Sequence, residues 1–312
     1  MGEDISVDVE ADINYFPATE EVIETKDWKP RLLGDADEHT RKMTIRDVRG
    51  MESHFELDKN GFQFVRLPTK PRDISTDEKI QSEYYAEITE VLEELYAWPI
   101  KGTFSLLTVQ VFPLLIFSCL KPPNSTGATT IHIFNHCIRQ CADPSQQGSL
   151  DHYGRWRVIP SGHPHVDYAG RPSDLRGTLE ELQFPAPIAA RFTSSSRFAF
   201  VNAWRPLATV RRDPLAVADA ATVPAGDYRV REREFRRTGV RSGNYVLSYG
   251  EGGHRWYYMS AMKEDEMVVF KGFDTKQDLP GWRCPHTAFV VEGTEALPPR
   301  ESIEVRAVCF WD

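Results

Sequence analysis

The stretch GHPHVDYAG, residues 162–170, places His165 two positions before Asp167. Side chains at positions i and i+2 of a β-strand point to the same face. A strand here would therefore present one imidazole and one carboxylate to a common point. His163 also precedes Asp167, but its spacing of four is less favourable, and we interpret it as a neighbour. His-x-Asp sequences are common by chance, so the pattern gains meaning only from a third group elsewhere in the chain.

His286, in RCPHTAF (283–289), is the candidate for that third group. Two histidines and one carboxylate form the facial triad that binds non-haem Fe(II) and leaves coordination positions open. Arg300 and Ser302 follow at the start of a later strand, where the same-face rule brings a guanidinium and a hydroxyl together. Such a pair suits a buried carboxylate. The order His-x-Asp, His, Arg-x-Ser matches Fe(II)/2-oxoglutarate-dependent oxygenases.

Two other residues compete for these roles. His254, in GGHRWYYMS, could be the distal histidine, but no Arg-x-Ser follows it in SAMKEDEMVV. Arg306 shares a strand face with Arg300, but at ~3.3 Å per residue it lies too far along to hold the same carboxylate. We therefore predict that Arg306 is a structural ion-pair partner.

The elements around these motifs indicate a mainly β chain with helices near its N-terminus. Thr76 caps a predicted helix over 77–98 with apolar residues at three-to-four spacing, and Asn60-Gly61 between 54–57 and 62–65 predicts a β-hairpin. Many short strands with N-terminal helices favour a sandwich or barrel with helical support. The other predicted strands are 129–134, 156–159, 198–204, 245–249, 255–259, 267–270 and 303–310.

Composition excludes several classes of protein. The 312 residues are 41% hydrophobic and 27% charged, and 37 basic against 46 acidic side chains give a net charge of −9. This charge repels polyanions, so nucleic acid is not an expected partner. The acidic N-terminus lacks the apolar core of a signal peptide. Five cysteines without a CxxC pair predict a reducing, cytoplasmic location rather than a disulfide framework or a zinc site.

The uncharged run FSLLTVQVFPLLIFSCL, residues 104–120, leaves three interpretations open. It could be a pair of buried strands around Pro113, an insertion foreign to the fold, or a membrane anchor. A membrane helix needs ~20 apolar residues, and Pro113 would interrupt this one. We therefore expect no membrane partner, but the sequence does not separate the first two interpretations.

Over residues 128–310 the sequence resembles the fungal gibberellin-desaturase-like hydroxylase/desaturase family. This resemblance implies a double-stranded β-helix (jelly-roll, cupin-like) barrel within a mainly β (α+β) chain. It also implies Fe(II) held by His165, Asp167 and His286, with 2-oxoglutarate bound by Arg300 and Ser302. The matching blocks are IFNHCIR (133–139), HVDY (165–168), NAWRP (202–206), RRDPLAVADA (211–220), HRWYYMS (254–260), DEMVVFKGFD (265–274), PHTAF (285–289) and PPRESIEVRA (298–307).

The resemblance further implies hydroxylation or desaturation of a small natural-product intermediate, with O2 as co-substrate and 2-oxoglutarate decarboxylated to succinate. Expected substrate or co-substrate contacts are Asn202, Trp204, Arg205 and Tyr257, although each could also serve as a core residue. The alternatives are a cupin-like iron dioxygenase or isomerase that does not use 2-oxoglutarate, and a silent binding protein with a vestigial site.

The expected organisation is one oxygenase domain over residues 1–312. Residues 1–127 form a helical and hairpin support, and residues 128–312 form the jelly-roll core. Relatives have a short connection before GATTIHIF, so we expect an insertion near residues 98–125.

Overall fold

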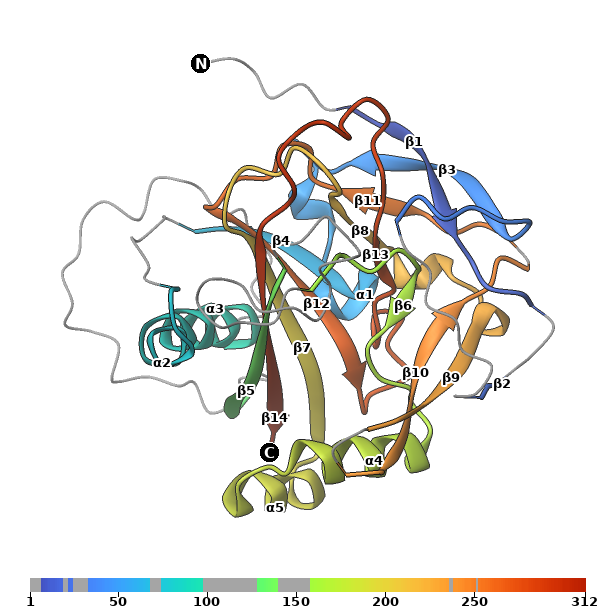
Figure 1. Ribbon diagram of the computed structural model, residues 1–312. Helices are drawn as coiled ribbons and strands as arrows, with labels where there is room; N and C mark the ends of the chain where they lie inside the picture. Colours follow the sequence, from blue (N-terminus) through green and yellow to red (C-terminus); the bar gives the residue numbers. More distant parts are fainter. Residues whose placement is uncertain are drawn as a thin grey trace.

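A computed structural model describes residues 7–18, 22–24, 33–67, 74–97, 128–139, 158–235, 238–250 and 252–312. These residues form two β-sheets that face each other, with helices on one outer face and at one end (Figure 1). The helices are α1 (Leu57–Asn60), α2 (Asp77–Lys79), α3 (Tyr85–Ala97), α4 (Pro172–Leu182) and α5 (Ala186–Ser194). Short 3-10 turns lie at Glu52–His54, Ala220–Thr222 and Ala225–Asp227.

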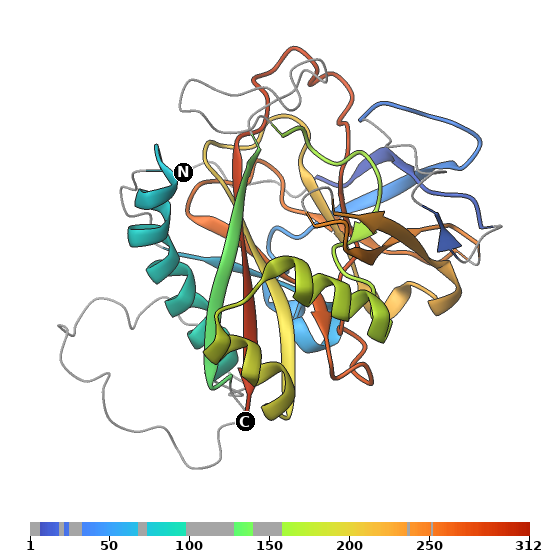
Figure 2. The same cartoon turned by 60° about the horizontal axis from the view of Figure 1, so that its bottom comes forward.

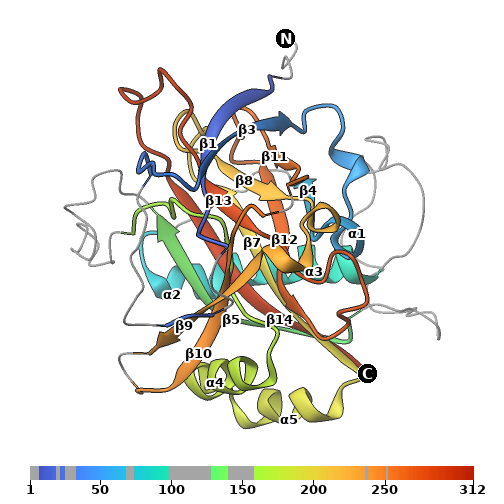
Figure 3. The ribbon, with the colours of Figure 1, turned by 90° about the vertical axis from the view of Figure 1, so that its right-hand side faces the viewer.

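The larger sheet has nine strands and the smaller has five. In spatial order the larger contains β1 (Val9–Asn14), β3 (Thr40–Asp47), β11 (Trp256–Tyr258), β8 (Leu215–Ala218), β13 (His286–Ala288), β6 (His165–Val166), β10 (Arg241–Leu247), β9 (Tyr228–Glu234) and β2 (Val22–Ile23). The smaller contains β4 (Phe62–Arg66), β12 (Glu266–Asp274), β7 (Arg197–Pro206), β14 (Ser302–Trp311) and β5 (Thr130–Arg139). Figure 3 looks onto the larger sheet, with the smaller one behind it. The predicted mainly β architecture with helical support is confirmed.

The smaller sheet is covered on both faces, because alternate residues of its strands pack in opposite directions. On β14, Val305, Ala307 and Cys309 pack outward in the same cluster as the buried side chains of α3. Val308 and Phe310 belong to a different, aromatic cluster on the inner face. The inner face also carries the polar residues of this strand, and it is the face that looks toward the larger sheet.

The predicted helix after Thr76 is confirmed. The Thr76 hydroxyl accepts a hydrogen bond from the amide of Lys79 (3.3 Å), and the helix then runs through α2, a π-helical turn at Ile80–Tyr84, and α3. Such a cap satisfies an amide that the first turn leaves unpaired. The buried face carries Ile80, Tyr84, Ile88, Val91 and Leu92, which pack on the outer side of the smaller sheet.

The hairpin predicted around Asn60-Gly61 is wrong. Residues 62–66 form β4, but residues 57–60 form the short helix α1. Gly61 has a left-handed φ of 86°, and its amide donates to the carbonyl of Leu57. The residue pair that resembles a hairpin turn is therefore a glycine helix C-cap, which also requires positive φ. A β-carbon at Gly61 would lie 2.6 Å from the Arg283 carbonyl oxygen, so the glycine is also needed for close backbone approach.

The helices α4 and α5 cross one end of the two sheets (Figure 2). Phe192 of α5 packs with Phe198, Phe200 and Phe310 from the inner face of the smaller sheet, and Phe184, between the two helices, packs on Phe192. This apolar cluster fills that end of the space between the sheets, and a second apolar cluster, with Trp204, Val217 and Phe270, also lies between them. The polar residues described below lie beside these two clusters.

Several predictions concern residues outside those described. They include the run 104–120, the insertion near 98–125, Cys119 and Cys141, and the first half of the strand 156–159. Residues 158 and 159 are described and are not in a strand. Among the described residues, no helix has the length and apolar character needed to span a membrane.

We expect Gly61→Ala to destabilise the protein by about 1–3 kcal/mol more than Gly50→Ala. Both glycines have positive φ, 86° and 82°, but a β-carbon at Gly50 would have no atom within 4 Å. The difference in free energy of unfolding, measured in urea, therefore isolates the clash with Arg283. Equal losses of unfolding free energy in the two variants would show that the backbone near Arg283 can shift to accommodate a β-carbon at little cost.

Candidate metal centre

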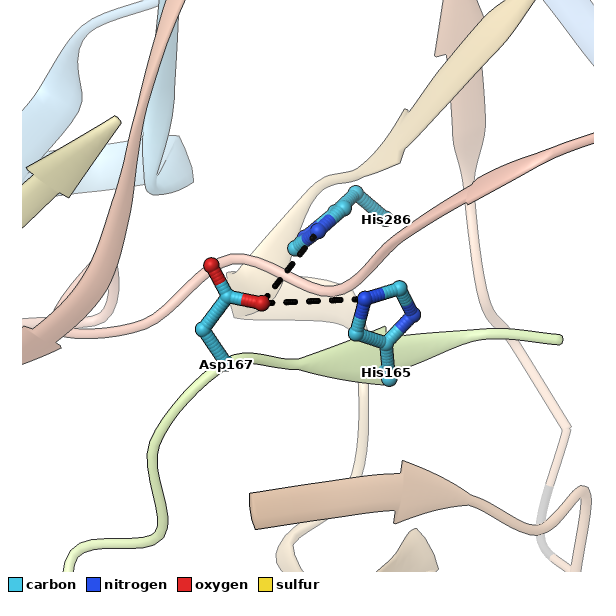
Figure 4. Close-up of side chains that lie close together, drawn as sticks. All are labelled: His165, Asp167 and His286. Atoms are coloured by element: carbon cyan, nitrogen blue, oxygen red, sulfur yellow. Dashed lines mark ion pairs between the residues drawn. The ribbon is translucent and has the colours of Figure 1, made fainter. Parts of the chain in front are cut away.

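The structure brings His165, Asp167 and His286 together in one cluster (Figure 4). His165 begins β6 and His286 begins β13, and the two residues are direct partners in the antiparallel pair. Asp167 follows β6 and points to the same place. Its Oδ1 lies 3.7 Å from His165 Nε2 and 3.9 Å from His286 Nε2. One ligand atom from each residue lies within 4.8 Å of the other two, close enough for one metal ion.

Backbone carbonyls fix the orientation of both imidazoles. Nδ1 of His165 lies 3.0 Å from the carbonyl oxygen of His163, and Nδ1 of His286 lies 3.2 Å from that of Cys284. A carbonyl oxygen can only accept, so Nδ1 carries the proton and Nε2 presents its lone pair to the cluster. Hydrogen bonding of the second nitrogen is what holds histidine ligands in place in metal sites.

Burial and charge keep the three groups in their metal-binding forms. Burial, followed by the nearby His286, lowers the pKa of His165 to about 3, and burial also lowers the pKa of His286. Burial alone would raise the pKa of Asp167, but the charge of Arg306, helped by the neighbouring histidines and the Asn202 hydrogen bond, outweighs it and lowers the pKa. At neutral pH the cluster therefore holds two neutral imidazoles and one carboxylate.

The second carboxylate oxygen of Asp167 is held by the smaller sheet. Asn202 on β7 donates from Nδ2 to Asp167 Oδ2 at 2.7 Å and to Glu304 at 3.1 Å. Arg306 on β14 lies 3.5 Å from the same Asp167 oxygen and also pairs with Glu304. The prediction that Arg306 is an ion-pair partner is confirmed, but one of its partners is a candidate metal ligand. No pattern in the amino-acid sequence indicates this contact between the two sheets.

Arg300 and Ser302 lie on the inner side of the smaller sheet, and both are buried. Arg300 donates from Nη1 to the Asp213 carbonyl at 2.7 Å and lies 5.2 Å from the Trp204 ring centre. In the described part of the chain it forms no ion pair, and neither its Nε nor Ser302 Oγ has a hydrogen-bond partner. Burial, together with the charge of Arg139, lowers the pKa of Arg300 to about 9. A buried cation and a hydroxyl without partners fit a carboxylate ligand.

Arg139 is a further residue of this region that the sequence analysis did not identify. It ends β5 directly opposite Ser302 of β14, so the two side chains share a face of the sheet. Its charge acts on Arg300 and on both histidines, lowering their pKa values. Its position at the end of the family-like block IFNHCIR was the available signal, but a strand sequence does not reveal its partner strand.

The other predicted contacts divide between the site and the core. Trp204 faces inward beneath Arg300. Arg205 points the opposite way, donates to Glu87 of α3 at 2.9 Å, and therefore does not face the cluster. Tyr257 packs against Phe55 and Phe62 in the apolar core.

The competing histidines lie outside the cluster. The ring nitrogens of His254 lie 3.0 Å from the Tyr15 hydroxyl and 3.0 Å from Asp227, in a buried network. The ring of His163 lies beside that of His165, with 5.3 Å between ring centres, and His163 remains a neighbour.

Comparison with known proteins agrees with this geometry. A family profile described as an oxidoreductase/YMDC permease-like domain matches residues 8–97 and 118–310. The alpha-ketoglutarate-dependent dioxygenase phiK of a fungal species is 31% identical over 276 residues, covering 87% of this chain and 84% of that protein. Alpha-ketoglutarate is 2-oxoglutarate. The chain belongs to this family of fungal hydroxylase/desaturases and 2-oxoglutarate-dependent dioxygenases.

Other members extend the range of named activities. The hydroxylase/desaturase efuI of Hormonema carpetanum is 29% identical over 293 residues, covering 88% of this chain and 85% of the relative. The gibberellin cluster GA4 desaturase of Gibberella fujikuroi is 28% identical over 310 residues, covering 86% of each protein. The predicted family and enzyme class are confirmed, as are Fe(II), 2-oxoglutarate and O2 as cofactor and co-substrates.

A solved structure shows the same fold. It is that of the iron and alpha-ketoglutarate-dependent endoperoxidase NvfI, with a TM-score of 0.70 and 20% sequence identity, covering 97% of this chain and 98% of that one. The predicted jelly-roll fold class is thereby confirmed.

We expect Asn202→Ala to weaken binding of Fe(II) by about 10–100-fold, because it removes a hydrogen bond that orients Asp167. Anaerobic metal titration measures this effect. Arg205→Ala is the matched control, since Arg205 lies on the same strand but faces α3. It should lower stability and leave metal affinity unchanged. An equal loss of metal affinity in both variants would contradict a specific role for Asn202.

Proposed function

We propose that this enzyme hydroxylates or desaturates a small natural-product intermediate in the cytoplasm. In this proposal His165, Asp167 and His286 hold Fe(II), and Arg300 and Ser302 bind the distal carboxylate of 2-oxoglutarate. The observation that carries the assignment is the convergence of two imidazoles and one carboxylate within 4.8 Å. The buried guanidinium of Arg300 also faces the space between the sheets and forms no ion pair with any residue that the structure describes.

The donor set suits Fe(II). Two neutral imidazoles and one carboxylate supply three ligands and leave other coordination positions open, as non-haem iron oxygenases require. When bound, Fe(II) supplies O2 activation coupled to oxidative decarboxylation of 2-oxoglutarate. Asn202 and Arg306 keep Asp167 deprotonated and in place. The Phe270 ring lies 4.5 Å from that of His286 and excludes water from one side of the ligand.

Arg300 supplies the charge that a dicarboxylate requires at its far end. The Asp213 carbonyl accepts a hydrogen bond from Nη1, and the Trp204 ring lies beside the guanidinium. These contacts hold Nε in place, and Nε has no hydrogen-bond partner in the described part of the chain. Ser302 adds a hydroxyl donor. Arg139 supports the same site by adding positive charge beside Arg300. A dioxygenase without 2-oxoglutarate, or a silent protein, would leave this buried charge without a function.

We also propose that the chain is one oxygenase domain with an insertion near residues 98–125. The family match supports this organisation, because it ends at residue 97 and resumes at residue 118.

We expect alanine at His165, Asp167 or His286 to abolish turnover and weaken iron binding while secondary structure is retained. In the unaltered enzyme, anaerobic addition of Fe(II) and 2-oxoglutarate should give the visible charge-transfer band of the chelate. His254→Ala is the control histidine variant and should still give the band. A His286→Ala variant with full activity, alongside an inactive His254→Ala variant, would show that the distal ligand is His254.

We expect Arg300→Ala to raise the 2-oxoglutarate concentration needed for half-maximal turnover by about 10²–10³-fold, because a carboxylate would lose its buried counter-charge. Ser302→Ala should act in the same direction by about tenfold, through one lost charge-assisted hydrogen bond. Titration of 2-oxoglutarate with succinate as the readout measures both effects. Arg66→Ala, at an exposed ion pair with Asp265, is the control. An unchanged requirement in Arg300→Ala would exclude this co-substrate site.

A further inference from the structure

Strand β9 presents a row of arginines to the inner face of the larger sheet. In its sequence YRVRERE every second residue is an arginine, so Arg229, Arg231 and Arg233 share one face of the strand. The register identifies that face. Arg229 lies opposite Val246 of β10, and Val246 lies opposite His165 of β6. Directly paired residues of antiparallel strands lie on the same side. The arginines are therefore on the side that bears His165 and Asp167.

Arg233 lies beside the candidate metal ligand Asp167, and part of its guanidinium has no strong hydrogen bond. Its Nη2 donates to the Asp167 carbonyl oxygen over a long 3.4 Å, and its guanidinium lies 4.9 Å from the Phe235 ring centre. Its Nε is buried and has no hydrogen-bond partner among the described residues. In that part of the chain no acid forms an ion pair with it. Asp174, whose charge also acts on Arg233, forms an ion pair with Arg171.

The polar surroundings of Arg233 favour an anion. Arg231 is the next residue on the same face, and Asn244 of β10 lies directly opposite Arg231. The Asn244 side-chain oxygen is also buried without a partner among the described residues. Arg306, the other nearby cation, already pairs with Glu304 and Asp167. Arg233 thus retains positive charge that the described side chains do not neutralise.

The co-substrate does not account for this charge. Arg300, Ser302 and Arg139 belong to the smaller sheet, whereas β9 lies near the edge of the larger one (Figure 1). The charges that act on Arg300 come from Arg139, Asp213 and Glu304, and those that act on Arg233 come from a different group of residues around Tyr168 and Asp167. Two separate sites for negative charge therefore flank the metal ligands.

We propose that the substrate carries a carboxylate and that Arg233 binds it, which sets the position of the substrate relative to the metal. This inference rests on the proposed function and adds the chemical class of its substrate. A carboxylate is indicated because Nε and the weakly engaged Nη2 form one edge of the guanidinium. Two parallel hydrogen bonds from such an edge match the two oxygens of a carboxylate.

The test uses a series of small aliphatic and aromatic carboxylates, each matched with its primary amide. The enzyme is loaded anaerobically with Fe(II) and 2-oxoglutarate, and binding is followed by the shift of the charge-transfer band and by ligand-observed NMR. At least one carboxylate should bind about tenfold or more tightly than its amide, because it gains a charge-assisted bidentate pair. Arg233→Gln should abolish that preference, and Arg233→Lys should restore only part of it.

Arg241→Gln is the matched control, since Arg241 is exposed on the neighbouring strand and pairs with Glu234. It should keep the preference for carboxylates. The proposal is overturned if no carboxylate in the series binds more tightly than its amide, or if Arg233→Gln keeps the preference. The unaltered enzyme can be compared across the series without any variant, so poor folding of one variant does not remove the test. Loss of the band itself in the unaltered enzyme would instead refute the proposed function.

Discussion

The site depends on the direct pairing of β6 with β13, which sets His165 opposite His286. Two imidazoles are fixed as soon as these two strands hydrogen-bond, and their Nδ1 atoms are held by backbone carbonyls. Asp167, which directly follows β6, then completes the cluster. Its outer oxygen is bound by Asn202 and Arg306 of the other sheet. The carboxylate therefore connects the two sheets, and the geometry of the cluster depends on how they face each other.

Buried charge is distributed unevenly around this cluster. Asp167 and Glu304 share Arg306 and Asn202, so both carboxylates have partners. Among the described residues, no acid forms an ion pair with Arg300 or Arg233, although a buried guanidinium normally requires one. An uncompensated buried charge costs stability, so cations of this kind are expected where a bound anion completes the pairing. Both arginines lie on inner faces, but on different sheets. In the proposed function one carboxylate of the co-substrate binds the metal and the other binds Arg300, which leaves Arg233 without an anion.

The sequence was sufficient to select the three candidate ligands that the fold brings together, but insufficient to predict the residues around them. His165 and Asp167 were found because a spacing of two has a definite meaning on a strand, and the helix after Thr76 because its apolar residues have a helical period. The hairpin predicted from Asn60-Gly61 was wrong because a hairpin turn and a helix C-cap both require a positive φ, so the same residue pair suits either structure. On β7, Asn202 faces the cluster and Arg205 faces α3, but that strand is buried on both faces, so its sequence does not show which face is inner. The positions of Arg306 and Arg139 depend on pairing between distant strands.

On strand β14, the alternation of side chains decides which residues lie around the candidate metal centre. Ser302, Glu304 and Arg306 alternate along its inner face, and Arg300 precedes them in the same phase. At the Arg300 end, the Ser302 hydroxyl and the Arg300 Nε have no hydrogen-bond partner among the described residues, whereas at the other end Arg306 pairs with Asp167. One strand thus supplies groups suited to an incoming carboxylate at one end and support for a candidate metal ligand at the other. A shift of its register by one residue would turn all four side chains toward α3, so the packing of Val305, Ala307 and Cys309 against that helix also fixes the site.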